Sequence, residues 1–116
     1  MKPKVFFERK TITNVEIIKI SGFMDISQTP QFEKYLDELL QAGSIKIVLD
    51  FADLDYISSS SLGVMIGRIH ELRKRGGDIK VGGCSPRIKD ILEAFGFPKI
   101  FTFKNTAEEA LQAFSG

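Results

Sequence analysis

Four consecutive serines, Ser58–Ser61, have the residue type and spacing best suited to chemistry in this chain. They precede an apolar segment with helical spacing, so they lie where the first backbone N–H groups of a helix lack partners within it. One serine there can cap the helix, which is worth about 1 kcal/mol. The alternative is a phosphorylatable hydroxyl, because the amides and the dipole at a helix N-terminus favour a phosphate.

A serine nucleophile would need a base within reach of its hydroxyl. The single histidine, His70, follows Ser61 by nine residues. On a helix that separation is about 13 Å along the axis, which is too far for proton transfer. The pattern Gly-x-Ser-x-Gly is also absent. We therefore predict no catalytic residues and no enzyme activity.

Four aspartates could bind a metal ion or accept a phosphoryl group, as in a response-regulator receiver. A receiver would need an acidic pair after its first strand, and the segment Val5–Lys10 is followed by none. A nucleotide-binding module would need a glycine-rich phosphate loop, which is also missing. We predict solvated loop aspartates, no metal site and no cofactor. The four residues are Asp25, Asp50, Asp53 and Asp55.

The composition is that of one globular domain. The chain has 116 residues, 43% apolar and 27% charged, which predicts a single domain over residues 1–116. Its 16 basic and 15 acidic side chains give a net charge of +1, which argues against direct nucleic-acid binding. The one cysteine, Cys84, leaves no intramolecular disulfide. No signal peptide or apolar span is present, so we expect a cytoplasmic chain without a membrane span.

Strand-like and helix-like segments alternate along the chain and predict an α/β fold. The first two strands are joined by a polar turn, Lys10–Asn14, and Gly22 opens a loop, Phe23–Gln28. A second loop carries Asp53 and Asp55. The expected strands are Val5–Arg9, Val15–Ser21, Ile45–Phe51, Asp78–Gly83 and Ile100–Phe103, and the expected helices begin at Thr29-Pro30, the serine run, Ser85-Pro86 and Thr106, with Thr29, Ser85 and Thr106 as caps.

This order predicts a mixed, mostly parallel sheet of about five strands with about four helices, the first two strands forming an antiparallel pair. In Ile45–Phe51 every odd position is apolar, whereas Lys46 and Asp50 fall on the other face. A sheet covered by helices on both faces would show continuous apolar runs instead. We therefore expect helices mainly on one face and a second face partly open to solvent.

Motifs occur along nearly the whole chain. The serine run stands where D-S-S/T-G-L-G would, with Ser58 in place of the aspartate and Ser61 in place of the glycine, and Gly22–Asp25 matches G-x-L/M-D. Further matches are Gly76-Gly77, Ser85-Pro86, Leu92 and Gly96–Phe101. Together these motifs resemble the STAS domain of bacterial anti-sigma factor antagonists, which implies a single STAS-like domain.

The resemblance implies a phosphoprotein that regulates transcription by partner switching. Unphosphorylated, it would bind an anti-sigma factor with serine kinase activity and so free a sigma factor. Phosphorylation would break the complex, and a serine phosphatase would restore it. The aligned acceptor is Ser59, with Ser58 and Ser60 as alternatives, and the chain would be a monomer or weak dimer. The alternative functions are a STAS subunit of a transport complex and a receiver-like or nucleotide-binding signalling domain.

A partner-binding edge is expected beside the serines. Loops at the C-terminal ends of parallel strands share one edge of a sheet, so the loop Phe23–Gln28 and the serine run should be neighbours. That edge would combine apolar anchors, a carboxylate and the switchable hydroxyl. Alternatively, the two apolar side chains fold inward and cap the core. The expected partner-binding residues are Phe23, Met24, Asp25, Ser58, Ser60 and Ser61.

Overall fold

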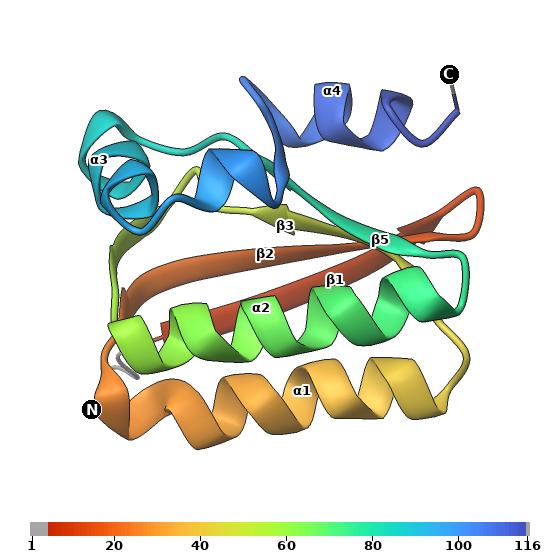
Figure 1. Ribbon diagram of the computed structural model, residues 1–116, viewed down its shortest axis with the longest axis horizontal. Helices are drawn as coiled ribbons and strands as arrows, with labels where there is room; N and C mark the ends of the chain where they lie inside the picture. The colour runs from red at the N-terminus through yellow and green to blue at the C-terminus, as the bar shows by residue number, and fades with distance from the viewer. Residues whose placement is uncertain (1–4, 116) are drawn as a thin grey trace.

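The computed structural model describes residues 5–115, and over that range it forms one six-stranded sheet (Figure 1). The predicted domain also included residues 1–4 and 116, which lie outside the described range. The hydrogen-bonded order is β1-β2-β3-β5-β6, and β4 pairs with β2 beside this path. The strands are β1 (Val5–Ile12), β2 (Val15–Met24), β3 (Lys46–Asp50), β4 (Leu54–Ile57), β5 (Asp78–Gly82) and β6 (Thr102–Lys104).

The antiparallel pairing of β1 with β2 was predicted and is confirmed, with Phe7 opposite Ile20. The turn is shorter than the predicted Lys10–Asn14. It consists of Thr13 and Asn14, both with positive φ (48° and 66°). Two-residue hairpin turns of this kind match the right-handed twist of the flanking strands, so both strands extend up to the turn.

The first two residues of the loop expected at Phe23–Gln28 are instead the end of β2, and Ile26–Gln28 form the 3-10 turn η1. Gly22 has a φ of 97°, and the pairing register shifts between Gly22 and Phe23, which marks a bulge. Beyond the bulge, Phe23 lies opposite Tyr56 in a parallel pair with β4. The segment expected as a loop through Asp53 and Asp55 therefore contains a short strand, and the sheet has six strands rather than about five.

The helices lie mainly on one face of the sheet, as predicted (Figure 1). In Figure 1, α1 and α2 run side by side below the strands, and α4 lies on the opposite side. None of the helices among residues 5–115 is long and apolar enough to cross a lipid bilayer. The helices and 3-10 turns are η1 (Ile26–Gln28), α1 (Thr29–Gln41), α2 (Ser59–Lys74), α3 (Pro86–Ala94), η2 (Phe97–Lys99) and α4 (Ala107–Gln112).

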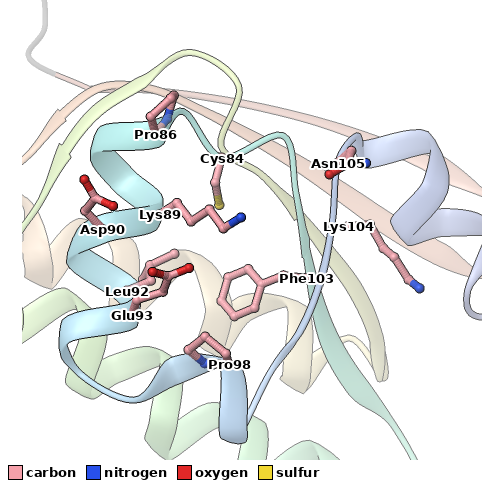
Figure 2. A pocket seen from close by; sticks show the side chains of 10 residues that line it. All are labelled: Cys84, Pro86, Lys89, Asp90, Leu92, Glu93, Pro98, Phe103, Lys104 and Asn105. Atoms are coloured by element: carbon pink, nitrogen blue, oxygen red, sulfur yellow. The ribbon is translucent and has the colours of Figure 1, made fainter.

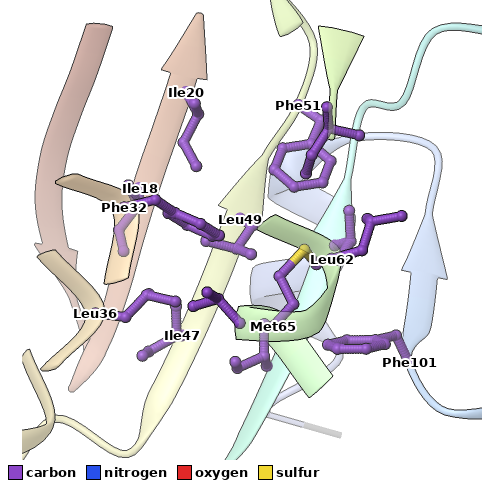
Figure 3. Packing of buried hydrophobic residues seen from close by; sticks show 14 of the residues in the cluster. Ile18, Ile20, Phe32, Leu36, Ile47, Leu49, Phe51, Leu62, Met65 and Phe101 are labelled. Carbon is purple, nitrogen blue, oxygen red and sulfur yellow. The ribbon is translucent and has the colours of Figure 1, made fainter. Parts of the chain in front are cut away.

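The main core lies between the sheet and the pair α1 and α2 (Figure 3). Alternate residues of β2 and β3 point to this face, because successive side chains of a strand face opposite ways. The apolar stripes of the two helices complete the layer, and α3 adds two residues at its edge. Its members include Ile18, Ile20, Ile47, Leu49, Phe32, Leu36, Leu62, Met65, Ile88 and Leu92.

The second face is only partly covered. A smaller cluster joins Val48 of β3 to Ala110 of α4, and Phe114 packs against it. The Lys80 ammonium lies 4.8 Å from the centroid of the Phe114 ring. Beyond this cover Asp50 remains partly exposed, in keeping with the polar and apolar alternation of its strand.

Arg68 of α2 forms ion pairs with two carboxylates of α1. The Nε of Arg68 is 2.6 Å from Asp37 Oδ1, and its Nη2 is 3.0 Å from Glu33 Oε2. The hydrogen bond to Asp37 is the largest cause that raises the pKa of Arg68. This contact fixes α2 against α1, and α2 carries the serine run at its first turn.

Candidate functional site

Ser58 caps α2. Its backbone is extended (φ −82°, ψ 158°), and its Oγ accepts a hydrogen bond from the Ser61 N–H at 3.3 Å. Its own N–H donates to the Met24 carbonyl at 2.8 Å, which carries the ladder between β2 and β4 one residue further. The capping interpretation is therefore confirmed for this one serine, whose side chain is buried.

A hydroxyl network connects the serine run to α1. Thr29 Oγ1 lies 2.7 Å from Ser60 Oγ and 2.9 Å from Ser61 Oγ. Ser58 Oγ lies 3.0 Å from Ser60 Oγ and donates to Ser61 Oγ at 3.2 Å. Four hydroxyls from two helix starts thus satisfy one another. The prediction that Thr29 caps α1 is wrong, because α1 begins at Thr29 and Gln28 occupies the cap position without a side-chain bond.

Ser59 differs from its three neighbours. Ser61 is 0% exposed, Ser58 is buried and Ser60 is half-buried, whereas Ser59 is exposed. Within residues 5–115, no side-chain hydrogen bond involves the Ser59 hydroxyl. It is the first residue of α2, where the backbone amides and the positive end of the dipole lie. Ser59 is therefore the serine of the run that an outside enzyme reaches most readily.

The segment Phe23–Gln28, which contains the end of β2 and η1, lies beside the serine run, as predicted. The contacts are the Ser58 bond to Met24 and the Thr29 bonds to the serines. Its two large apolar side chains, Phe23 and Met24, point in opposite directions, because successive residues of a strand face opposite sides of the sheet. Phe23 is 47% exposed, and Met24 is 0% exposed. Met24 packs in the core, so its expected place on the surface is wrong.

Two surface features were not among the expected partner-binding features: the exposed side chain of Ile26 and the contact between Phe23 and Tyr56. Ile26, on η1, is 74% exposed, the highest value among the large apolar side chains of residues 5–115. Sequence reasoning did not single it out, although an isoleucine within the polar stretch Asp25–Gln28 was a usable signal. Phe23 contacts Tyr56 on β4, with ring centroids 6.2 Å apart.

Asp25 caps η1 beside the serine run. Its Oδ1 accepts hydrogen bonds from the Ser27 backbone N–H at 3.0 Å and from the Ser27 hydroxyl at 2.6 Å, which caps η1. The carboxylate thus holds the turn that leads into α1. It also places a negative charge close in the chain to Met24, the residue bonded to Ser58.

The four aspartates do not form one site. Asp53 pairs with Lys19 at 2.9 Å, and that hydrogen bond raises the pKa of Lys19. Asp50 accepts from the Ala52 N–H at 3.0 Å. No group of three acidic, thiol or imidazole side chains among residues 5–115 is placed to hold a metal ion.

A cavity of about 600 Å³ lies between α3 and β6 (Figure 2). Cys84, Lys89 and Phe103 point into it, and its lining includes both lysine and acidic side chains. Burial raises the pKa of the Cys84 thiol to about 11, which keeps it protonated and a poor nucleophile at neutral pH. The lining residues come from neither the serine run nor η1, so the cavity is separate from the serine site.

Similarity to known proteins extends over most of the chain. The family model described as STAS domain matches residues 7–110. BtrV of Bordetella bronchiseptica is 31% identical over 103 residues, 89% of each chain. The anti-sigma F factor antagonist of Paenibacillus polymyxa is 30% identical over 98 residues, 84% of each chain. The phosphorylated form of the Bacillus cell fate determinant SpoIIAA superposes with a TM-score of 0.73 at 22% identity, covering 94% of this chain and 99% of SpoIIAA. From the family match and these relatives, the chain belongs to the STAS-domain family.

Proposed function

We propose that this chain is an anti-sigma factor antagonist that is switched at Ser59. In this proposal the unphosphorylated form binds an anti-sigma factor with serine kinase activity and so frees a sigma factor. The names of the relatives support the regulatory class. The observation that carries the assignment of the site is the exposed Ser59 hydroxyl at the start of α2, a helix that contacts η1, the turn with the exposed Ile26.

The switch follows from the chemistry of the hydroxyl. A neutral Ser59 hydroxyl loses little when it is covered by a partner that offers a hydrogen bond. A phosphate brings a charge of about −1.5 to −2, which an apolar interface does not accommodate without cations. Asp25 adds like charge nearby. Phosphorylation therefore weakens the complex, and a phosphatase restores it.

The partner surface in this proposal is the edge formed by η1 and the start of α2. Phe23 and Ile26 provide apolar contact area, and Asp25 faces a basic group of the partner. Ser58, Ser60 and Ser61 shape the surface from within through the hydroxyl network. The kinase activity belongs to the partner, and this chain supplies the acceptor.

The test is titration calorimetry against the anti-sigma factor kinase of the same host. We expect Ser59→Asp to weaken binding by at least about tenfold. Ser115→Asp, which adds the same charge at an exposed position after α4, should bind like the unmodified chain. Ser59→Ala should bind but resist labelling by the kinase and ATP. Equal affinity of Ser59→Asp and the unmodified chain would refute the proposal.

A further inference from the structure

Thr29 makes contacts that its own helix does not require. It is the first residue of α1 and has helical backbone angles (φ −57°, ψ −43°), so its hydroxyl does not cap that helix. The hydroxyl instead reaches across to α2, where it lies 2.7 Å from Ser60 Oγ and 2.9 Å from Ser61 Oγ. Thirty-one residues separate Thr29 from Ser60, so only the tertiary fold creates this contact.

The four serines differ in burial and in the hydrogen bonds of their hydroxyls. Ser58 and Ser61 are buried and cannot present a hydroxyl to another protein. Ser60 is half-buried, next in sequence to Ser59, and therefore the one competitor within the run. Its hydroxyl lies between Thr29 Oγ1 and Ser58 Oγ, at 2.7 and 3.0 Å.

Phosphoryl transfer requires an acceptor hydroxyl that can turn toward the donor. The serine oxygen forms a bond to the γ-phosphorus of a nucleoside triphosphate, the bond from that phosphorus to the nucleoside diphosphate breaks, and the hydroxyl proton passes to a base of the kinase. The oxygen must be in line with the leaving group. A Ser60 hydroxyl held by two hydrogen bonds must break both before it reaches that position.

We propose that Thr29 is the positioning residue that makes Ser59 the phosphoacceptor, by holding the Ser60 hydroxyl inside the network. This inference rests on the proposed function, in which the serine run is a kinase substrate. Thr29 touches no reacting atom. It acts through Ser60 and leaves Ser59 as the exposed hydroxyl of the run.

Two variants test this assignment. Thr29→Val keeps the branched shape and removes the hydroxyl, whereas Thr29→Ser keeps the hydroxyl and removes the methyl group. After incubation with the anti-sigma factor kinase and ATP, the phosphate on each serine is quantified by mass spectrometry. We expect phosphate on Ser59 in the unmodified chain and in Thr29→Ser. In Thr29→Val, the fraction on Ser60 should rise by about tenfold.

A second measurement needs no kinase. In a double-mutant cycle, the melting temperature is measured for Thr29→Val, Ser60→Ala and the combined variant. If the two hydroxyls are coupled, the combined loss should be smaller than the sum of the single losses by about 3 °C. Additive losses would overturn the inference, as would an unchanged phosphate distribution in Thr29→Val. Absence of phosphate from every serine of the unmodified chain would instead overturn the proposed function, while the cycle would still decide whether Thr29 holds Ser60.

Discussion

The Ser58 backbone N–H donates to the Met24 carbonyl oxygen over 2.8 Å. This bond joins the end of β2 to the first residue before α2. Because Met24 is anchored in the core, the bond also fixes the start of α2 relative to the residues on either side of Met24. Phe23 and Asp25 therefore lie close to the serine run, and a partner that covers one part of this edge covers the other.

The charge of Asp25 can be tested apart from its capping role. Asp25→Asn keeps a side-chain oxygen that can accept from the Ser27 N–H, so η1 should keep its cap. We expect affinity for the anti-sigma factor to fall by about tenfold or more, with the melting temperature unchanged within a few degrees. Calorimetry and melting curves measure both. Asp90→Asn, at an exposed position of α3, is the matched control and should leave affinity unchanged.

Ile26 should contribute to partner binding and little to stability. Ile26→Ala removes a side chain that is 74% exposed, so the free energy of unfolding should change by less than about 0.5 kcal/mol. Loss of a covered apolar anchor should lower affinity by about tenfold. The control is Ile12→Ala, an exposed isoleucine at the β1 end of the hairpin turn. If the two variants bind equally well, Ile26 lies outside the interface.

Two glycines should respond to alanine with opposite signs. A Cβ on Gly67, in the interior of α2, meets nothing within 4 Å, so Gly67→Ala should stabilise the chain by about 0.5–1 kcal/mol. A Cβ on Gly82 would lie 2.4 Å from the Thr106 carbonyl oxygen. Gly82→Ala should therefore destabilise by more than about 1 kcal/mol, through displacement of the start of α4. Urea unfolding measures both, and equal changes would contradict this account of the two sites.

Cys84 should be unreactive in the folded chain near neutral pH. Burial raises the pKa of its thiol to about 11, so alkylation by iodoacetamide at pH 8 should be much slower than in the unfolded chain. As the pH rises from 9 to 11, the unfolded thiol ionises first and the folded thiol stays protonated. The unfolded state then binds fewer protons, so stability falls over this window. Cys84→Ala should show a smaller fall, and equal alkylation rates in both states would contradict the shift.

The sequence predicted the main strands and helices in the right order, but it missed β4 and the full length of β2. Gly22 and the two aspartates Asp53 and Asp55 are typical of loops. In the structure, Gly22 forms a bulge within β2, and Leu54–Ile57 pairs with the strand beyond that bulge. Four residues carry too short an alternation to identify a strand without its partner. The pairing of Leu54–Ile57 with β2, a strand distant in sequence, therefore determines that this segment is a strand, and local sequence preference alone does not.

The site was predictable in its main chain and less so in its side chains. A helix start at the serine run and an adjacent segment after β2 both followed from the pattern. The Thr29-Pro30 pair predicts that the Thr29 hydroxyl caps its own helix, because such a pair is a common helix start. Instead η1 occupies the preceding turn and the hydroxyl bonds to Ser60 and Ser61. Such contacts depend on the packing of α1 against α2, which no local sequence signal encodes.

The outer strands of the sheet influence whether two copies of the chain can pair edge to edge. At one edge, β1 carries three consecutive exposed charged residues, Glu8, Arg9 and Lys10. At the other, β6 has only three residues and ends at the exposed Lys104. Edge-to-edge pairing would strip the charged side chains of β1 of water, and at β6 it would gain very few backbone bonds. The charged residues of β1 and the shortness of β6 therefore disfavour growth of the sheet from its edges into a fibril.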